Sequence, residues 1–192
     1  MTIPFIIVAV LILFVAIGIF GYMVSAYNAL IATKNNVQKA FANIDVILKQ
    51  RHDEIPKLIQ TCEGYMTYER ATLQKVVDAR AAYLGTGNMA QKAQASDQMS
   101  AALKSLFAVA ENYPDLKANQ NFLQLQARVS GLEESLADRR EFYNDSVNAY
   151  NISIQEFPNV FIANMMGLKP AEMFNVSDAD KTEPSMDIRQ PS

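Results

Sequence analysis

Tryptophan is absent from this 192-residue chain, and cysteine and histidine occur once each. The lone Cys62 excludes an intrachain disulfide and so does not indicate a redox compartment. The lone His52 cannot form a zinc site of the usual type, which needs several His or Cys ligands. The formal net charge of -3 comes without any cluster of Lys and Arg, whereas phosphate binding needs grouped cations. We therefore expect no cofactor, no metal and no nucleic-acid partner.

Charged residues and histidine are also absent from residues 2–33, and residues 3–24 are mostly Ile, Leu, Val, Phe, Ala and Met. A helix needs about 20 apolar residues, at ~1.5 Å each, to cross a hydrocarbon core ~30 Å thick. This run therefore predicts a membrane anchor over residues 1–26 that spans the lipid bilayer once. The alternative is a secretory signal peptide, because Val24-Ser25-Ala26 resembles a cleavage site. The length of the run and the lack of a basic n-region favour retention.

Positive charge follows the predicted anchor closely and does not precede it, apart from the terminal amine. Such an excess of Lys and Arg is typical of the cytoplasmic side of a span, so it favours a cytoplasmic body. The residues concerned are Lys34, Lys39, Lys49, Arg51 and Lys57.

Three later stretches have apolar residues at every third or fourth position, which is typical of helices with one buried face. The first runs from Val37 to residue 84, through Pro56, where we expect a kink without chain reversal, and through Gly64. Its buried stripe is predicted to contain Val37, Phe41, Ile44, Leu48, Ile55, Leu58, Cys62, Leu73 and Val76. Residues 85–88, Gly-Thr-Gly-Asn, form a predicted break; they lack the further glycines and the Lys of a phosphate-binding loop.

The second stretch begins near Met89 and stops before Pro114, and residues 115–121 are expected to form a turn. Its inner face is predicted to hold Met99, Leu103, Leu106, Ala110 and Tyr113. The third has a heptad-like repeat, which predicts a coiled-coil-like seam. That seam contains Phe122, Leu125, Val129, Leu132, Leu136, Tyr143, Val147, Tyr150, Ile154 and Phe157. Pro158 is expected to end this helix or to open a short last one through Phe161, Met165 and Met166.

These patterns predict an all-α protein, in which a single transmembrane helix precedes an antiparallel bundle of three long helices with a short fourth element. The expected divisions are the anchor at 1–26, the helical body at 27–168 and a flexible, disordered tail at 169–192. The end of that tail is rich in Asp, Ser, Pro, Lys and Glu, and its low hydrophobicity cannot offset the entropy of ordering it.

Two arginines fall on the predicted seams. The phase of the first stretch places Arg51 there, and the phase of the third places Arg139 there. A buried arginine costs several kcal/mol unless it is paired, so each should bind a carboxylate or lie at the seam edge.

No residue cluster predicts a reaction. Ten residues of helix separate His52 from Cys62 by ~15 Å, which is beyond hydrogen-bond reach. We interpret His52 as a helix-surface residue that packs near its neighbours, and Cys62 as a small buried hydrophobe. The heptad row of Tyr143, Tyr150 and Phe157 is expected to belong to the core. We expect no catalytic residue.

Several motifs together resemble the LemA family of bacterial membrane proteins. They are an apolar anchor followed by YNAL at 27–30, NIDVILKQRHDEIPKL at 43–58, Gly64-Tyr65, YPDLKAN at 113–119, FLQLQ at 122–126, RREFYN at 139–144 and Tyr150-Asn151. The resemblance extends to about Pro170. It implies a single-pass protein of the bacterial inner membrane with an all-helical body, and it carries no catalytic residues to this chain.

We therefore expect a non-enzymatic, membrane-anchored scaffold or organiser that self-associates and binds protein partners. Lateral homo-oligomers are expected to use apolar residues outside the main seam, such as Phe142 and Ile152, because the third stretch carries more apolar surface than one seam accommodates. The alternative is an accessory subunit or an enzyme whose site forms only between chains, with His52 and Asp53 of one chain meeting Cys62 or Glu63 of another.

Overall fold

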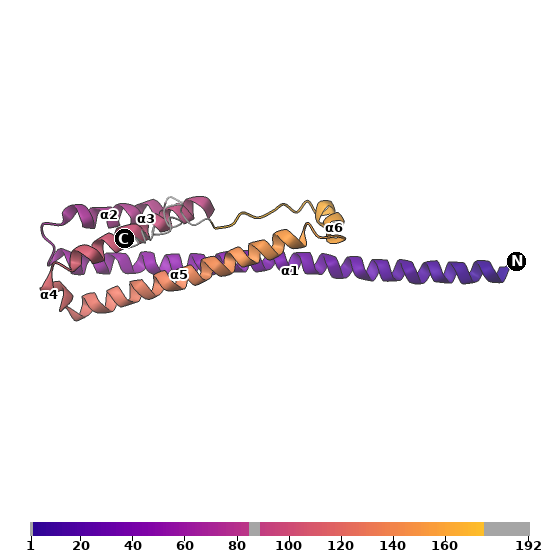
Figure 1. Ribbon diagram of the computed structural model, residues 1–192, viewed down its shortest axis with the longest axis horizontal. Helices are drawn as coiled ribbons and strands as arrows, with labels where there is room; N and C mark the ends of the chain where they lie inside the picture. Colours follow the sequence, from indigo (N-terminus) through magenta and orange to yellow (C-terminus); the bar gives the residue numbers. More distant parts are fainter. Residues whose placement is uncertain (1, 85–88, 175–192) are drawn as a thin grey trace, which may run out of the picture. The chain divides into compact units, whose positions relative to one another are not determined.

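The computed structural model describes residues 2–84 and 89–174, and helices without strands make up this part of the chain (Figure 1). The all-α fold class is thus confirmed. The helices are α1 (Thr2–Glu63), α2 (Arg70–Leu84), α3 (Met89–Ala110), α4 (Pro114–Lys117), α5 (Gln120–Ser153) and α6 (Asn159–Met165). The break predicted at 85–88 lies outside the described residues.

Helix α1 continues through Pro56 without chain reversal, as predicted, but it ends at Glu63. The backbone N–H groups of Tyr65 and Met66 both donate to the Cys62 carbonyl, which closes a turn at Gly64. The prediction of one helix through Gly64 was wrong. The error arose because α2 buries Leu73 and Val76 in the same core as the end of α1. The apolar spacing therefore continues across the turn as it would in a single helix. The predicted span and the first part of the predicted body helix thus form one helix, α1, and the rest of that predicted helix is a separate helix, α2.

The described residues form two compact units, and both α1 and α5 contribute to each. One unit contains residues 45–138 together with Phe174. Within it, α2 and α3 pack along each other. Its core is formed by Ile55, Leu58, Cys62, Met66, Leu73, Val76, Ala79, Met99, Ala102, Leu103, Leu106, Ala110, Leu116, Phe122 and Val129.

The connection between α3 and α5 is more ordered than the expected turn at 115–121. Pro114 opens the short helix α4, because its fixed φ suits the first helical turn, and Leu116 of α4 is fully buried. The Asn119 side-chain oxygen then accepts hydrogen bonds from the backbone N–H groups of Asn121 and Phe122, at 2.9 and 3.1 Å. Asn119 thereby caps the start of α5.

The other unit contains residues 2–44 and 139–173. Its core brings together Ala26 and Leu30 of α1 with residues of the α5 end and of α6, namely Tyr150, Ile154, Ile162 and Ala163. Helix α6 begins directly after Pro158, as predicted. Tyr143 and Tyr150 are buried, but the prediction for Phe157 was wrong: its side chain is 81% exposed, because the chain leaves α5 after Ser153 and the heptad phase is lost.

The segment predicted to be a flexible tail begins with residues that are bound to α5. The Tyr150 hydroxyl donates to the Lys169 carbonyl at 3.1 Å, and the Tyr143 hydroxyl donates to the Glu172 carbonyl at 2.9 Å. The Asn151 side chain both donates to the Ala171 carbonyl at 3.0 Å and accepts from the Ala171 N–H at 2.8 Å. Residues 169–173 are therefore attached, and residues 175–192 lie outside the described residues.

Candidate functional site

Helix α1 begins with an apolar surface that is exposed along its whole length. Residues 3–25 are all exposed, although nearly all of them are hydrophobic. The most apolar 18-residue window has a mean hydropathy of 3.2 and is 0% buried. Among the described residues, α1 is the one helix long and apolar enough to cross a membrane. Its exposed surface is what a lipid-facing span requires.

Inside the unit formed by residues 45–138, Arg51 is the centre of a buried polar network. Its side chain is 3% exposed. Nη1 forms an ion pair with Glu133 Oε1 and donates to Ser100 Oγ at 3.0 Å. Nη2 donates to Ser96 Oγ at 2.8 Å and to the Ser96 carbonyl at 3.2 Å. The prediction that Arg51 is buried and paired is confirmed.

The carboxylate of Glu133 is bound through both oxygens. Arg51 occupies Oε1, and the Ser100 hydroxyl lies 2.6 Å from Oε2 and donates to it. The network thus connects α1, α3 and α5 through four side chains. Hydrogen bonds on both partners are the condition under which a buried charge pair is tolerated, because they replace the water that each group lost.

The sequence prediction missed the three partners of Arg51, which are Ser96, Ser100 and Glu133. A signal for the serines exists in α3, where Ala93, Ser96 and Ser100 are spaced at three and four residues. Such spacing places small side chains on one helix face, which leaves room for a long cation from a neighbouring helix. Nothing in the local sequence distinguishes Glu133 from the adjacent Glu134.

Three further ion pairs in the same unit involve the carboxylates of Glu54 and Asp45. Glu54 is 7% exposed at its side chain and binds Arg128 Nε at 2.9 Å and Lys57 Nζ at 3.1 Å. Lys92 Nζ lies 2.8 and 2.9 Å from the two carboxylate oxygens of Asp45. These buried and half-buried charges are compensated, so they stabilise helix packing and do not form an open acid–base pair.

The seam prediction for Arg139 was wrong, because this residue is exposed. The heptad pattern leaves either the third or the fourth residue after Leu136 on the seam, that is, Arg139 or Arg140. In the structure Arg140 is the less exposed of the two. Steps of three and of four residues both return to nearly the same face of a helix with 3.6 residues per turn, so the repeat alone does not distinguish the two positions.

The two residues weighed as chemical groups are separately packed. Cys62 is fully buried, as predicted, and desolvation raises the pKa of its thiol to about 11. His52 is 13% exposed, its Nδ1 lies 3.4 Å from Asp53 Oδ1, and its ring centroid lies 5.8 Å from that of Tyr83. His52 thus packs near its neighbours, as expected, but it is more buried than a surface residue. Its Nε2 has no hydrogen-bond partner among the described residues.

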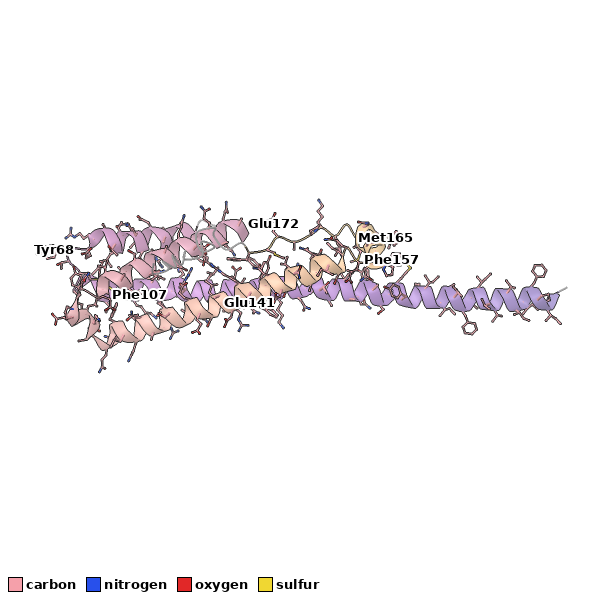
Figure 2. All side chains as sticks on the ribbon, viewed as in Figure 1. Tyr68, Phe107, Glu141, Phe157, Met165 and Glu172 are labelled. Carbon is pink, nitrogen blue, oxygen red and sulfur yellow. The ribbon has the colours of Figure 1, made fainter. Side chains whose placement is uncertain are left out.

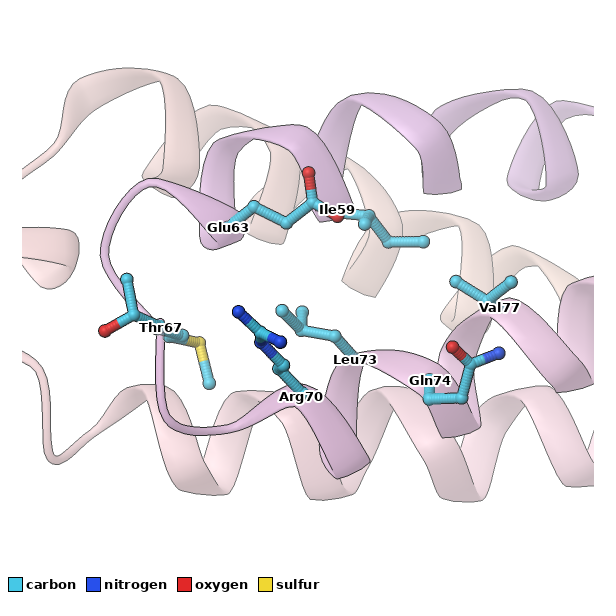
Figure 3. A pocket seen from close by; sticks show the side chains of 8 residues that line it. Ile59, Glu63, Thr67, Arg70, Leu73, Gln74 and Val77 are labelled. Atoms are coloured by element: carbon cyan, nitrogen blue, oxygen red, sulfur yellow. The ribbon is translucent and has the colours of Figure 1, made fainter.

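A pocket of about 410 Å³ lies where α1 ends and α2 begins. Figure 3 shows Glu63 of α1 and Arg70 of α2 on facing sides, with Ile59, Leu73 and Val77 further along the pocket. No histidine, serine or cysteine lines it. Across residues 2–84 and 89–174, no group of three His, Cys, Asp or Glu side chains could hold a metal ion. The pocket therefore has opposite charges and apolar walls, and its lining has one hydroxyl, that of Thr67, without a histidine beside it.

One family model and several known proteins are similar to this chain. Residues 40–188 match the model of the LemA family. Protein LemA of Metamycoplasma hominis is 27% identical over 180 residues, covering 91% of this chain and 80% of the relative. Magnetosome protein MamQ 2 of Paramagnetospirillum magneticum and magnetosome protein MamQ of Magnetospirillum gryphiswaldense are 22% and 21% identical, each covering 81% of this chain and 67% of the relative. The chain is a membrane-associated protein that belongs to the LemA family.

Proposed function

We propose that this protein is a non-enzymatic scaffold that crosses the bacterial inner membrane once, holds its helical body in the cytoplasm, self-associates laterally and binds protein partners. The observation that carries this proposal is the continuity of α1. One helix contains both the exposed apolar run at residues 3–25 and the buried residues of the body, from Ala26 to Cys62. A partner bound to the body would thereby be held at the membrane surface.

Self-association is supported by apolar side chains on the outside of α5. Both Phe142, which is 52% exposed, and Ile152, which is 47% exposed, belong to α5. Anchoring confines the bodies to two dimensions and raises their effective concentration, so weak lateral contacts become significant.

An enzymatic site completed by a second chain has less support. In the form that uses Cys62 as the nucleophile, the thiol is fully buried and its pKa is raised to about 11; the form that uses Glu63 keeps an exposed carboxylate. A nucleophilic cysteine needs a lowered pKa and access to substrate.

The anchor and its orientation can be tested in whole cells with the full chain. Tyr68 is 94% exposed in the turn before α2, so a Tyr68→Cys variant presents an accessible thiol, whereas the unmodified chain has only the buried Cys62. A membrane-impermeant maleimide should label Tyr68→Cys only after the cells are permeabilised, and it should not label the unmodified chain. Labelling of intact cells would contradict a cytoplasmic body.

Retention of the anchor needs a separate measurement. After alkaline washing, the protein should stay in the membrane pellet, and the intact mass should include residues 1–26. Loss of these residues would favour the signal peptide instead.

A further inference from the structure

The segment from Phe157 to Met165, here called the α6 tip, carries large apolar side chains on its surface. Phe157 is 81% exposed, Phe161 is 66% exposed and Met165 is 75% exposed. The rings of Phe157 and Phe161 meet edge to face, with centroids 6.0 Å apart. Figure 2 shows Phe157 and Met165 beside α1, where α6 meets that helix. No charged residue occurs between Phe157 and Leu168.

Contacts with α1 fix the position of the α6 tip along that helix. Ile162 and Ala163 belong to the same core cluster as Ala26 and Leu30. The Tyr22 hydroxyl donates to Asn159 Oδ1 at 3.3 Å. The tip therefore lies beside the last residues of the apolar run, at the level where α1 would leave the bilayer.

We propose that the α6 tip inserts into the headgroup region of the bilayer and gives the protein a second lipid contact beside its span. This inference rests on the proposed anchor, because the position of the tip follows from where α1 leaves the membrane. Aromatic side chains favour the membrane–water interface, and exposed apolar residues beside a span reach it without any change in fold. Tyr22 and Tyr27, each 47% exposed, supply further interfacial aromatics on α1.

The α6 tip is uncharged as well as close to the span, and both properties favour contact with lipid. Asn159 is held by Tyr22, and the charged residues nearest the tip in sequence, Glu156 and Lys169, flank it outside the run from 157 to 168. A second contact would restrict rotation of α1 about its own axis and so fix which face of this unit points away from the lipid surface.

The absence of tryptophan allows a direct test by fluorescence. Three single substitutions in the full chain place one tryptophan each in the α6 tip, in the span and in the other unit: Phe161→Trp, Phe14→Trp and Tyr68→Trp. Each chain is reconstituted in vesicles of phosphatidylglycerol and phosphatidylcholine that carry bromine either near the headgroup or deep in the acyl chains. All three sites are strongly exposed aromatic residues, so folding should be preserved; circular dichroism verifies this.

Phe161→Trp should emit to the blue of Tyr68→Trp and should lose more emission to shallow bromines than to deep ones. Phe14→Trp should be quenched by deep bromines, which reports the anchor independently. If Phe14→Trp is quenched while Phe161→Trp behaves like Tyr68→Trp, the α6 tip does not touch lipid and the inference is overturned. Blue-shifted emission of Phe161→Trp without quenching by either lipid would show a protein-covered surface, such as a second copy, and would also overturn it. Failure of Phe14→Trp to be quenched would instead contradict the anchor.

Discussion

Arg51 and Glu133 form an ion pair that connects α1 to α5, and the arginine is almost fully buried while the glutamate is 30% exposed. Ser96 and Ser100 of α3 complete the hydrogen bonds of both charged groups. The pair therefore connects three helices at one point, and removing either charge leaves its partner uncompensated.

Replacing Arg51 by Ala should lower the free energy of unfolding by about 3 kcal/mol, because the loss of a buried partner is costly and Glu133 regains only part of its hydration. Arg139→Ala is the matched control on α5. Because the Arg139 side chain is exposed, its loss should lower the free energy of unfolding by under ~1 kcal/mol. Urea unfolding of the detergent-solubilised chains, followed by circular dichroism, measures both values. Equal losses would contradict the network.

A double variant, Arg51→Met with Glu133→Met, should recover much of the stability that Arg51→Ala loses. Two apolar side chains of similar volume leave no unpaired charge, and such replacements are often neutral or stabilising. The same unfolding measurement gives the comparison. A double variant less stable than Arg51→Ala would show that the ion pair itself contributes strongly to the fold.

Cys62 should react very slowly with thiol reagents while the protein is folded. Burial raises its pKa to about 11, so only about one thiol in 10⁴ is ionised at pH 7. Maleimide labelling followed by mass spectrometry should give no adduct at pH 7 in buffer and a complete adduct in denaturant. Because the folded thiol resists ionisation, the stability that this burial supports should be present below the ordinary pKa of 9.0 and should fall as the pH rises towards 11. Rapid labelling of the folded chain would contradict the packing.

Asn151→Ala should release residues 169–173 from α5. The Asn151 side chain forms both of its bonds with the backbone of Ala171, so the Ala171 N–H should lose its protection from hydrogen exchange. Ser153→Ala is a suitable control, because that hydroxyl bonds only to the Ala149 carbonyl of its own helix. Unchanged exchange of the 169–173 peptide in Asn151→Ala would refute the attachment.

The attachment should also depend on pH. Burial raises the pKa of the Tyr143 and Tyr150 hydroxyls, and the nearby Glu172 charge raises that of Tyr143 further. Both hydroxyls must be protonated to donate to the Glu172 and Lys169 carbonyls. The stability that these hydroxyls give to the attached segment is therefore complete below the ordinary pKa of 10.0. It is lost as the pH rises through the raised pKa values of the two hydroxyls. Exchange of the same peptide, corrected for the intrinsic pH effect, should stay slow up to about pH 10.

The sequence predicted the features that depend on local pattern. The apolar run of α1, the α3 helix ending before Pro114 and the α6 helix after Pro158 follow from composition, periodicity and proline chemistry. The turn at Gly64 was missed because the apolar residues of α1 and α2 follow one another at the same spacing as in a single continuous helix. The partners of Arg51 were missed because they lie 45 to 82 residues away in sequence. Attachment of residues 169–173 depends on hydrogen bonds from Tyr143, Tyr150 and Asn151 to a segment that is 19 to 29 residues away in sequence. The spacing of apolar residues within one helix does not predict such bonds.

Lateral self-association of the anchored body is tested most directly by cross-linking in native membranes. Ile152→Glu and Leu123→Glu place the same charge on α5, at side chains that are each 47% exposed. The unmodified chain and Leu123→Glu should give a ladder of cross-linked oligomers, whereas Ile152→Glu should give mainly the monomer, because a charge in an apolar contact is strongly unfavourable. A monomer in all three chains, or the same ladder for Ile152→Glu as for the unmodified chain, would contradict a scaffold that assembles through this face.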